Sequence, residues 1–413
     1  MALIGYALRL KAPALLIFCV IFSLGHVVPI LTKLGLLEIS YSALPPERSD
    51  YDQQTLAMAF LACLGVVAGY FAWRGKAPTR PALIGRRWVR SDALDALPKV
   101  TWALIGVILA LVTFPAGGPI AFLEINFVRV IPEHSTIATA IYLCAVICAV
   151  LATVQLVIDL QRGRHPRFVQ LAVTSMIFWS MGGRLQFSVT VAAYALAMLR
   201  YRYLSKKALW ILVLASALPV FATIYIRLSL QGRHTTLGES VTHTLDELSM
   251  LGSYNLAVQY VAEAGHQPLL WLSQLESLLP RAFNPDKPQQ ISRLFRQLFW
   301  GDELGGVPPA LVGEFYIIGG LAFCMIGGLL LGHLLRRLDQ LYRYPQGRSV
   351  VEQAAIFAFI PLVSFYLVRV GMDSSIFRIV LSLLVFGGLG FVIPKAAVQR
   401  FRKLSTGRQV LSS

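Results

Sequence analysis

The fold of this chain is decided by stretches such as residues 137–160, which read IATAIYLCAVICAVLATVQLVIDL. Asp159 is the only charged residue in this stretch, and it lies at the carboxyl-terminal end. A helix rises about 1.5 Å per residue, so about 20 apolar residues cross the hydrocarbon core of a bilayer. The stretch is therefore predicted to be a transmembrane helix.

Similar apolar runs recur along the chain and predict an all-α, polytopic transmembrane helix bundle of about ten spans. A run at 168–200 is interrupted by Met181, Gly182, Gly183 and Arg184, and is predicted to form two short helices that meet at a polar break. The other runs fall at 11–32, 54–74, 100–116, 208–226, 311–335, 351–369 and 376–394. The expected parts are an N-terminal bundle of about seven spans (1–226), a large helical loop (227–310), and about three spans with a basic tail (311–413).

Composition supports a membrane protein. Of 413 residues, 56% are hydrophobic and 14% charged, and the mean hydropathy is +0.65, whereas soluble domains carry about 25% charged residues. The five cysteines all fall in predicted spans, so neither a disulfide framework nor a zinc site is expected.

A net charge of +16 is compatible with a nucleic-acid partner, but the distribution of the charge along the chain indicates a membrane topology instead. Twenty-five Lys and Arg and five acidic residues lie in the two termini and in 75–99, 161–167, 200–207 and 336–350, counted together with the flanking Arg74, Asp159 and Glu352. The rest of the chain has 12 basic and 16 acidic residues. Basic loops of membrane proteins face the cytoplasm. We therefore expect both termini in the cytoplasm, the loop 227–310 on the far side, and no nucleic-acid partner.

The loop 227–310 is predicted to be folded. Helices are expected at 239–264 and at 269–279, and a third is expected to begin at Pro288. The third helix is amphipathic and is predicted to lie at the membrane interface, with the loop closing over the bundle as a lid. Its apolar face comprises Ile291, Leu294, Phe295, Leu298 and Phe299.

No nucleotide-binding or hydrolase motif is present in the sequence, so neither ATP nor dinucleotide chemistry is expected, and no cofactor is expected. Arginines instead gather at predicted outer membrane boundaries, where guanidinium groups suit an anionic headgroup. Each of them could equally snorkel to the interface or pair with a carboxylate, and Arg378 could pair with Asp373. The candidate diphosphate- or substrate-binding residues are Arg184, Arg227, Arg233, Arg281, Lys287 and Arg369.

Candidate catalytic residues are Glu314, His243 and Arg184. Glu314, in Gly313-Glu314-Phe315-Tyr316, is either a general base or a structural partner of an arginine. His243, like His234 and His266, is either a proton carrier or polar surface, and the spacing of these histidines predicts no metal site. Asp50 and Asp52 are either a catalytic pair or a solvated turn. Separately, Gly328 and Gly332 form a GxxxG pattern typical of close helix packing.

The loop and its flanks resemble the O-antigen and oligosaccharide repeat-unit polymerases. The resemblance rests on Pro280-Arg281, Pro285-Asp286-Lys287-Pro288, Gly305-Gly306-Val307-Pro308-Pro309, Gly313-Glu314-Phe315-Tyr316, Gly319-Gly320 and the upstream Gly183-Arg184. It is specific over about 180–332. It departs at Leu185, where the family often has a small residue.

The resemblance implies a metal-independent glycosyltransferase in the bacterial inner membrane. Its partners would be an undecaprenyl-diphosphate-linked glycan donor and acceptor, the lipid bilayer and a chain-length regulator protein. Arg184, with Arg281 or Arg369, would hold the diphosphate, and Glu314 or a loop histidine would deprotonate the acceptor. Three alternatives stay open: an O-antigen ligase, a glycosyltransferase that uses Asp50 or Asp52, and a transporter or flippase.

Overall fold

The structure is a computed structural model. It describes residues 4–5, 7, 12–33, 53–72, 91–113, 135–181, 184–205, 207–208, 211–212, 218–220, 222, 225–226, 236, 250–276, 290–300, 308–344 and 348–392. These residues contain helices and turns but no strand. The helices are α2 (Pro13–Lys33), α3 (Gln53–Ala72), α4 (Ser91–Thr113), α6 (Ser135–Gln161), α7 (Phe168–Ser180), α8 (Arg184–Arg200), α11 (Leu251–Ala264), α12 (Leu270–Glu276), α13 (Ile291–Trp300), α14 (Ala310–Arg343), α15 (Val350–Pro361), the π-helical η3 (Leu362–Leu367) and α16 (Val368–Val392).

Five of the described helices are long and apolar enough to cross a membrane, judged by length and composition. Shorter apolar helices accompany them at Pro13–His26, Phe168–Ser180 and Ser375–Phe391. The all-helical, membrane-type fold predicted from the sequence is therefore confirmed. The five long helices are Gln53–Ala72, Ala96–Thr113, Ala140–Gln161, Ala310–Arg343 and Val350–Met372.

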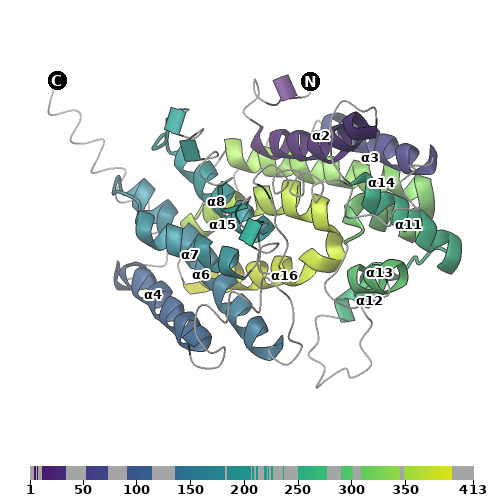
Figure 1. Ribbon diagram of the computed structural model, residues 1–413. Helices are drawn as coiled ribbons and strands as arrows, with labels where there is room; N and C mark the ends of the chain where they lie inside the picture. Colours follow the sequence, from purple (N-terminus) through teal and green to yellow (C-terminus); the bar gives the residue numbers. More distant parts are fainter. Residues whose placement is uncertain are drawn as a thin grey trace.

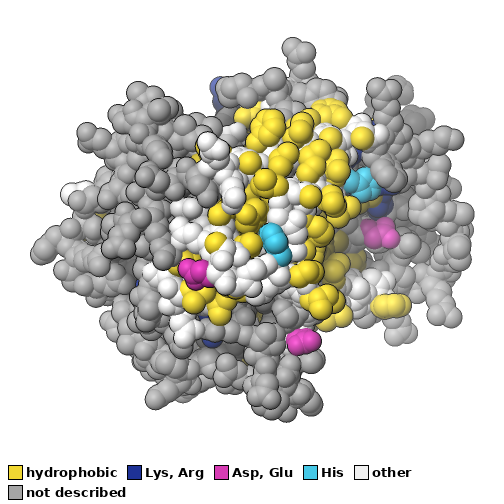
Figure 2. Space-filling view, turned by 90° about the vertical axis from the view of Figure 1, so that its right-hand side faces the viewer, with side chains coloured by type: hydrophobic (Ala, Val, Ile, Leu, Met, Phe, Trp, Pro, Cys, Tyr) yellow, Lys and Arg dark blue, Asp and Glu magenta, His cyan; other side chains and the backbone are white. Residues whose placement is uncertain are grey.

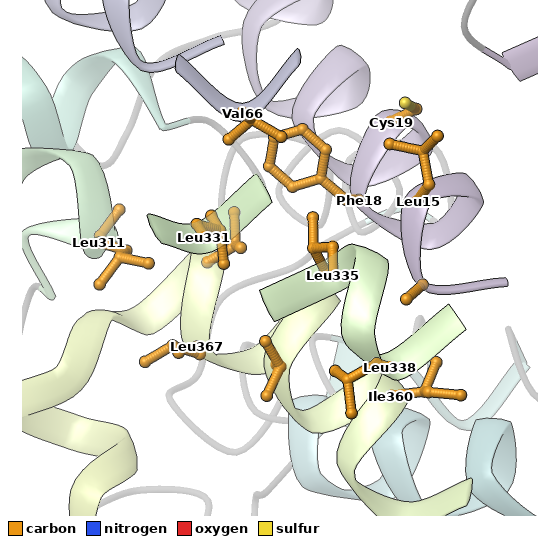
Figure 3. Packing of buried hydrophobic residues seen from close by; sticks show 14 of the residues in the cluster. Leu15, Phe18, Cys19, Val66, Leu311, Leu331, Leu335, Leu338, Ile360 and Leu367 are labelled. Carbon is orange, nitrogen blue, oxygen red and sulfur yellow. The ribbon is translucent and has the colours of Figure 1, made fainter. Parts of the chain in front are cut away.

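The helices form two groups with α15 and α16 between them (Figure 1). Helices α2, α3 and α14 lie together in one group, and α4, α6 and α7 lie together in the other. In the first group, Phe18 of α2, Val66 of α3 and Leu335 of α14 meet in one hydrophobic cluster (Figure 3). A second cluster joins α4 and α6 to α7 and α8.

Helices α3 and α14 pack with their backbones in close contact. A Cβ added at Gly328 would lie 2.5 Å from the carbonyl oxygen of Ala62, and one at Gly332 would overlap that of Val66. On α3, Gly65 and Gly69 meet the backbone of α14 in the same way. Two GxxxG patterns thus face each other, which confirms the close helix approach predicted for Gly328 and Gly332.

The span predicted at 311–335 lies within α14, which is long and apolar enough to cross a membrane, but two glycines divide this helix. Gly319 and Gly320 have non-helical backbone angles, and Gly320 has φ +67°, ψ −158°, a region that is almost confined to glycine. Beyond this break the chain folds back on itself. The Phe315 ring lies where a Cβ on Gly327 would be, and the Cys324 thiol donates to the Val312 carbonyl at 3.7 Å. In a straight helix, residues twelve apart would be about 18 Å apart. Residues 310–318 therefore form a short helix beside the longer one that follows.

Helices α7 and α8 form an antiparallel pair around the break at 181–183. His165 lies just before α7 and Tyr203 just after α8, and His165 Nδ1 is hydrogen-bonded to the Tyr203 hydroxyl at 3.0 Å. The two helix ends that lie away from the break therefore meet. The prediction of two short helices at 168–200 is thus confirmed. Helix α7 has 13 residues, so it is about 20 Å long and shorter than a hydrocarbon core of about 30 Å.

One end of the bundle is held together around Asp339 and is called the Asp339 end. The buried Asp339 carboxylate accepts from the backbone N–H groups of Ala14 (2.8 Å) and Leu15 (3.2 Å), and from the Tyr70 hydroxyl (2.8 Å). It therefore caps the first turn of α2, where backbone donors lack partners within the helix. Arg336 donates to the Tyr70 carbonyl at 2.6 Å at the end of α3.

The same end gathers the termini of three further helices, α6, α8 and α15. Arg200, the last residue of α8, donates to the Tyr342 carbonyl near the end of α14 at 3.2 Å. Gln161, at the end of α6, donates to Tyr201 at 2.9 Å and to Gln353 of α15 at 3.2 Å. Helices α6, α8 and α14 therefore end, and α15 begins, at the end of the bundle where α2 begins.

Candidate functional site around Glu314

The opposite end of the bundle is built around Glu314 and is called the Glu314 end. Glu314 lies in the short helix 310–318, whose fold-back at Gly319 and Gly320 carries it into the molecule. Its side chain is fully buried, at 0% exposure. A buried carboxylate is stable only when hydrogen-bonded or paired, so its partners define what this end of the protein can do.

Two donors from distant parts of the chain bond the same carboxylate oxygen. Glu314 Oε2 accepts from the backbone N–H of Met372 at 2.7 Å and from the indole N–H of Trp271 at 3.1 Å. Met372 begins the helical segment that follows the Gly371 break in α16, and Trp271 belongs to α12 of the loop segment. The carboxylate thus joins the loop to the membrane-type bundle, and it places negative charge at a helix amino terminus.

Gly371 makes this contact possible. Its backbone has φ +79° and ψ 177°, which side chains other than hydrogen rarely allow. A Cβ at this position would overlap Glu314 Oε1. Only glycine therefore permits both the turn between η3 and the rest of α16 and the approach of the carboxylate.

The segment before α12 closes the short helix 310–318 at its carboxyl end. Gln267 donates its backbone N–H to the Ile317 carbonyl at 2.8 Å, and His266 Nδ1 lies 3.1 Å from the Tyr316 carbonyl oxygen. These contacts satisfy carbonyls that a helix end leaves open. Tyr316 in turn donates to Gln54 of α3 at 3.0 Å. Gly313-Glu314-Phe315-Tyr316 is therefore bonded to the loop and to two other helices.

Two predicted phosphate-binding arginines lie at this end. Arg369 is two residues before Gly371 and is 9% exposed. Arg184 is the first residue of α8 and is half-buried. Gln186, two residues later in the first turn of α8, donates to the Tyr366 hydroxyl of η3 at 2.9 Å. The starts of α8 and of α16 are therefore neighbours, and both arginines belong to the same region.

The remaining predicted site residues cannot be placed. His243, Arg227, Arg233, Arg281 and Lys287 lie outside the described residues. The same holds for the alternative aspartates Asp50 and Asp52. Where the chain is described, no group of three or more His, Cys, Asp and Glu is close enough to hold a metal ion.

Helix α11 is buried rather than exposed. Its first eight residues are all buried, and Met250, just before it, donates its N–H to the Gly25 carbonyl of α2 at 3.0 Å. Gly313 packs against Ala257 of this helix, where an added Cβ would approach to 3.3 Å. Helices α11, α12 and α13 fall within the three helices predicted in the loop segment, but α11 begins at Leu251, so the helix predicted over 239–264 does not continue through Met250. Helix α11 forms part of the wall behind Glu314.

The surface on the side of α11, α12 and α13 is shown in Figure 2. Hydrophobic side chains predominate over its described part, with isolated acidic and histidine side chains among them. Helix α13 has Ile291 and Phe295 buried, whereas Arg293 is exposed. The apolar face predicted for this helix therefore packs, at least at these two residues, against the protein.

The residues that sequence reasoning missed are Trp271, Gly371 and Met372. Trp271 is not part of any sequence motif. Its indole reaches Glu314 because residues 266–267 bond to the end of the short helix 310–318. Gly371 had a signal, since it is a glycine between two predicted spans and close to Arg369.

No protein-family model matches this chain, and no solved structure matches it. The site must therefore be interpreted from its own chemistry. It combines a buried carboxylate with both donors on one oxygen, two glycine breaks, and two arginines at the starts of neighbouring helical segments.

Proposed function

We propose that this protein polymerises undecaprenyl-diphosphate-linked oligosaccharide repeat units at the periplasmic face of a bacterial inner membrane. The observation that carries the proposal is the Glu314 contact. The motif on which the family resemblance rests is bonded by loop helix α12 and by the turn that follows Arg369. Glu314, which belongs to that motif, is therefore held at the turn that follows Arg369, a residue that the resemblance implies for the diphosphate.

The charges of the two ends support the proposed orientation. The Asp339 end carries the basic turns around Arg162, Arg200, Arg336 and Arg343, which would face the cytoplasm under the positive-inside rule. The Glu314 end would then face the periplasm, with about ten spans in all and both termini inside. Lipid-linked repeat units are presented on that face.

In this proposal Arg184 and Arg369 bind the diphosphate of the donor. A guanidinium group donates two parallel N–H bonds to phosphate oxygens, and its charge stabilises the diphosphate as it leaves. The hydroxyl of the acceptor sugar attacks the anomeric carbon of the donor. The carbon–oxygen bond to the diphosphate breaks, undecaprenyl diphosphate departs, and a base takes the hydroxyl proton.

Of the two roles left open for Glu314, the geometry favours the structural one. Its carboxylate has no exposed surface, and Oε2 already accepts two N–H bonds. We therefore assign Glu314 as a positioning residue that fixes the turn after Arg369. The base would be another group, and His243 is the remaining candidate from the sequence.

Deleting the gene in its host and separating the surface glycans on a gel tests the proposal. A single repeat unit on lipid A core, with the ladder of longer chains lost, is the expected result. Bare core with long polymer on the carrier lipid would instead identify an O-antigen ligase. An unchanged glycan profile would refute both.

A second candidate, a transporter or flippase, is favoured by one observation. Arg378 is 5% exposed and lies inside the bundle, and helices broken by glycine line many transport sites. For a flippase, deletion would leave bare core and lipid-linked single units trapped on the cytoplasmic leaflet. Protection of those units from an externally added glycosidase in intact spheroplasts would distinguish this outcome.

A further inference from the structure

Arg378 lies inside the bundle and contacts mostly uncharged groups. It is in α16, seven residues after Gly371, and only 5% of it is exposed. Its Nη2 donates to the Thr190 hydroxyl of α8 at 3.4 Å. Its guanidinium carbon lies 5.0 Å from the centroid of the Phe178 ring and 5.3 Å from that of Tyr366. The aromatic faces offset part of its charge.

The rest of that charge is not balanced by the described protein. Among the described side chains, no carboxylate forms an ion pair with Arg378, and its Nη1 has no hydrogen-bond partner. A buried cation that is neither paired nor fully hydrogen-bonded costs several kcal/mol. A group with negative charge beside Nη1 would remove this cost.

A pocket of about 30 Å³ lies beside Arg378. Besides the guanidinium, its polar lining comes from Ser382, Thr153 and Thr190. The two threonine hydroxyls donate to the helix carbonyls of Ala149 and Gln186. Ser382 is one helical turn after Arg378 on the same face of α16, so its hydroxyl and the guanidinium can bind one group.

The size and charge of the pocket specify its ligand. A volume of about 10–15 Å³ holds one water-sized group, so a pocket of about 30 Å³ has room for a small ion. Its lining supplies one cationic group, Arg378, which favours a ligand with a single negative charge. We propose that Arg378 and Ser382 form a buried site for a single small monovalent anion, chloride in the cell. The pocket is lined by neither Glu314 nor Arg184 nor Arg369, and the proposal holds whether or not the protein is a polymerase.

The bound anion has a structural consequence. Arg378 joins α16 to α7, α8 and η3. Neutralising its charge lets these helices pack without a buried unpaired cation. The stability of the folded protein should therefore increase with the concentration of an anion that fits, by mass action.

The test is thermal unfolding of the purified full-length protein in detergent, with sodium chloride replaced stepwise by sodium gluconate at constant ionic strength. The melting temperature of the wild type should rise with chloride and with bromide. Arg378→Gln should remove this response. The matched control is Arg293→Gln, at an exposed arginine of α13, which should respond as the wild type does.

A second variant keeps the test valid if Arg378→Gln does not fold. Ser382→Ala removes one hydroxyl and should raise the chloride concentration needed for half of the effect by about tenfold, as expected for a hydrogen bond to a charged group. Equilibrium dialysis with radioactive chloride should give one ion per wild-type chain. A melting temperature equal in chloride and gluconate would overturn the proposal, as would an unchanged response in both Arg378→Gln and Ser382→Ala. A chloride response that appears in Asp373→Asn but not in the wild type would also overturn it, because Asp373 would then be the counter-charge of Arg378.

Discussion

Replacing Glu314 with alanine and with glutamine separates its two possible roles. Both N–H donors bond the same oxygen, Oε2. Glutamine in the same rotamer can place its carbonyl oxygen there and keep both bonds. Alanine keeps neither, and it leaves the N–H of Met372 and the indole of Trp271 without this acceptor.

The magnitudes follow from these contacts. Each buried donor without an acceptor costs about 1–3 kcal/mol, so Glu314→Ala should lose about 2–6 kcal/mol of unfolding free energy. Glu314→Gln keeps these two bonds and loses the carboxylate charge at the helix amino terminus, which is worth about 0.3–2 kcal/mol. The expected order of stability is wild type, then glutamine, then alanine well below.

The assay combines melting temperature in detergent with chain polymerisation in the deletion strain. If Glu314 positions the turn after Arg369, the glutamine variant keeps most of its activity. If it is the general base, glutamine loses about 10²–10⁴-fold of the rate while remaining folded. Equal stability of the alanine and glutamine variants would refute the structural argument, and a folded, inactive glutamine variant would refute the positioning role.

Three further substitutions test the account. Gly371→Ala should destabilise the protein more than Gly265→Ala. The two glycines have similar φ angles, +79° and +76°, so alanine costs about 1–3 kcal/mol of backbone strain at both positions. An added Cβ overlaps Glu314 only at Gly371, and the difference in melting temperature between the two variants measures the cost of this overlap. Gly332→Leu should abolish folded protein in the membrane fraction, since α3 has no room for the side chain, whereas Gly387→Leu, with nothing within 4 Å of an added Cβ, should be expressed normally. Arg369→Gln should abolish the glycan ladder while the protein is still expressed and folded, and a full ladder would exclude Arg369 from the diphosphate site.

Much of the fold could be predicted because lipid imposes a simple rule on helices. Runs of about 20 apolar residues gave α3, α4 and α6 to within a few residues at most ends. The break at 181–183 was visible as an arginine and two glycines inside an apolar run. The mutual contact of Gly328 and Gly332 with α3 followed from the known preference of small residues for helix interfaces.

The fold-back of 310–318 could not be predicted in the same way. Gly319 and Gly320 lie in a continuous apolar run, and hydropathy does not distinguish a glycine that packs from a glycine that turns. The turn is specified by tertiary contacts, namely Phe315 against Gly327 and the caps from His266 and Gln267. The mean hydropathy over 311–335 does not depend on these tertiary contacts and so cannot predict the turn.

The candidate site was predicted in part. The sequence singled out Glu314 and Arg369, because charged residues are costly at a membrane boundary. It did not give Trp271 or the backbone of Met372 as their neighbours, since those contacts depend on how the loop docks. Whether Arg227, Arg233 and Arg281 join the same site stays a prediction.

The central claim is tested most directly with purified protein reconstituted in liposomes and given a synthetic undecaprenyl-diphosphate-linked repeat unit. The account predicts a ladder of longer lipid-linked glycans, with one undecaprenyl diphosphate released for each bond formed, and no ladder with Arg369→Gln. A substrate that remains a single unit in the presence of folded wild-type protein would contradict it.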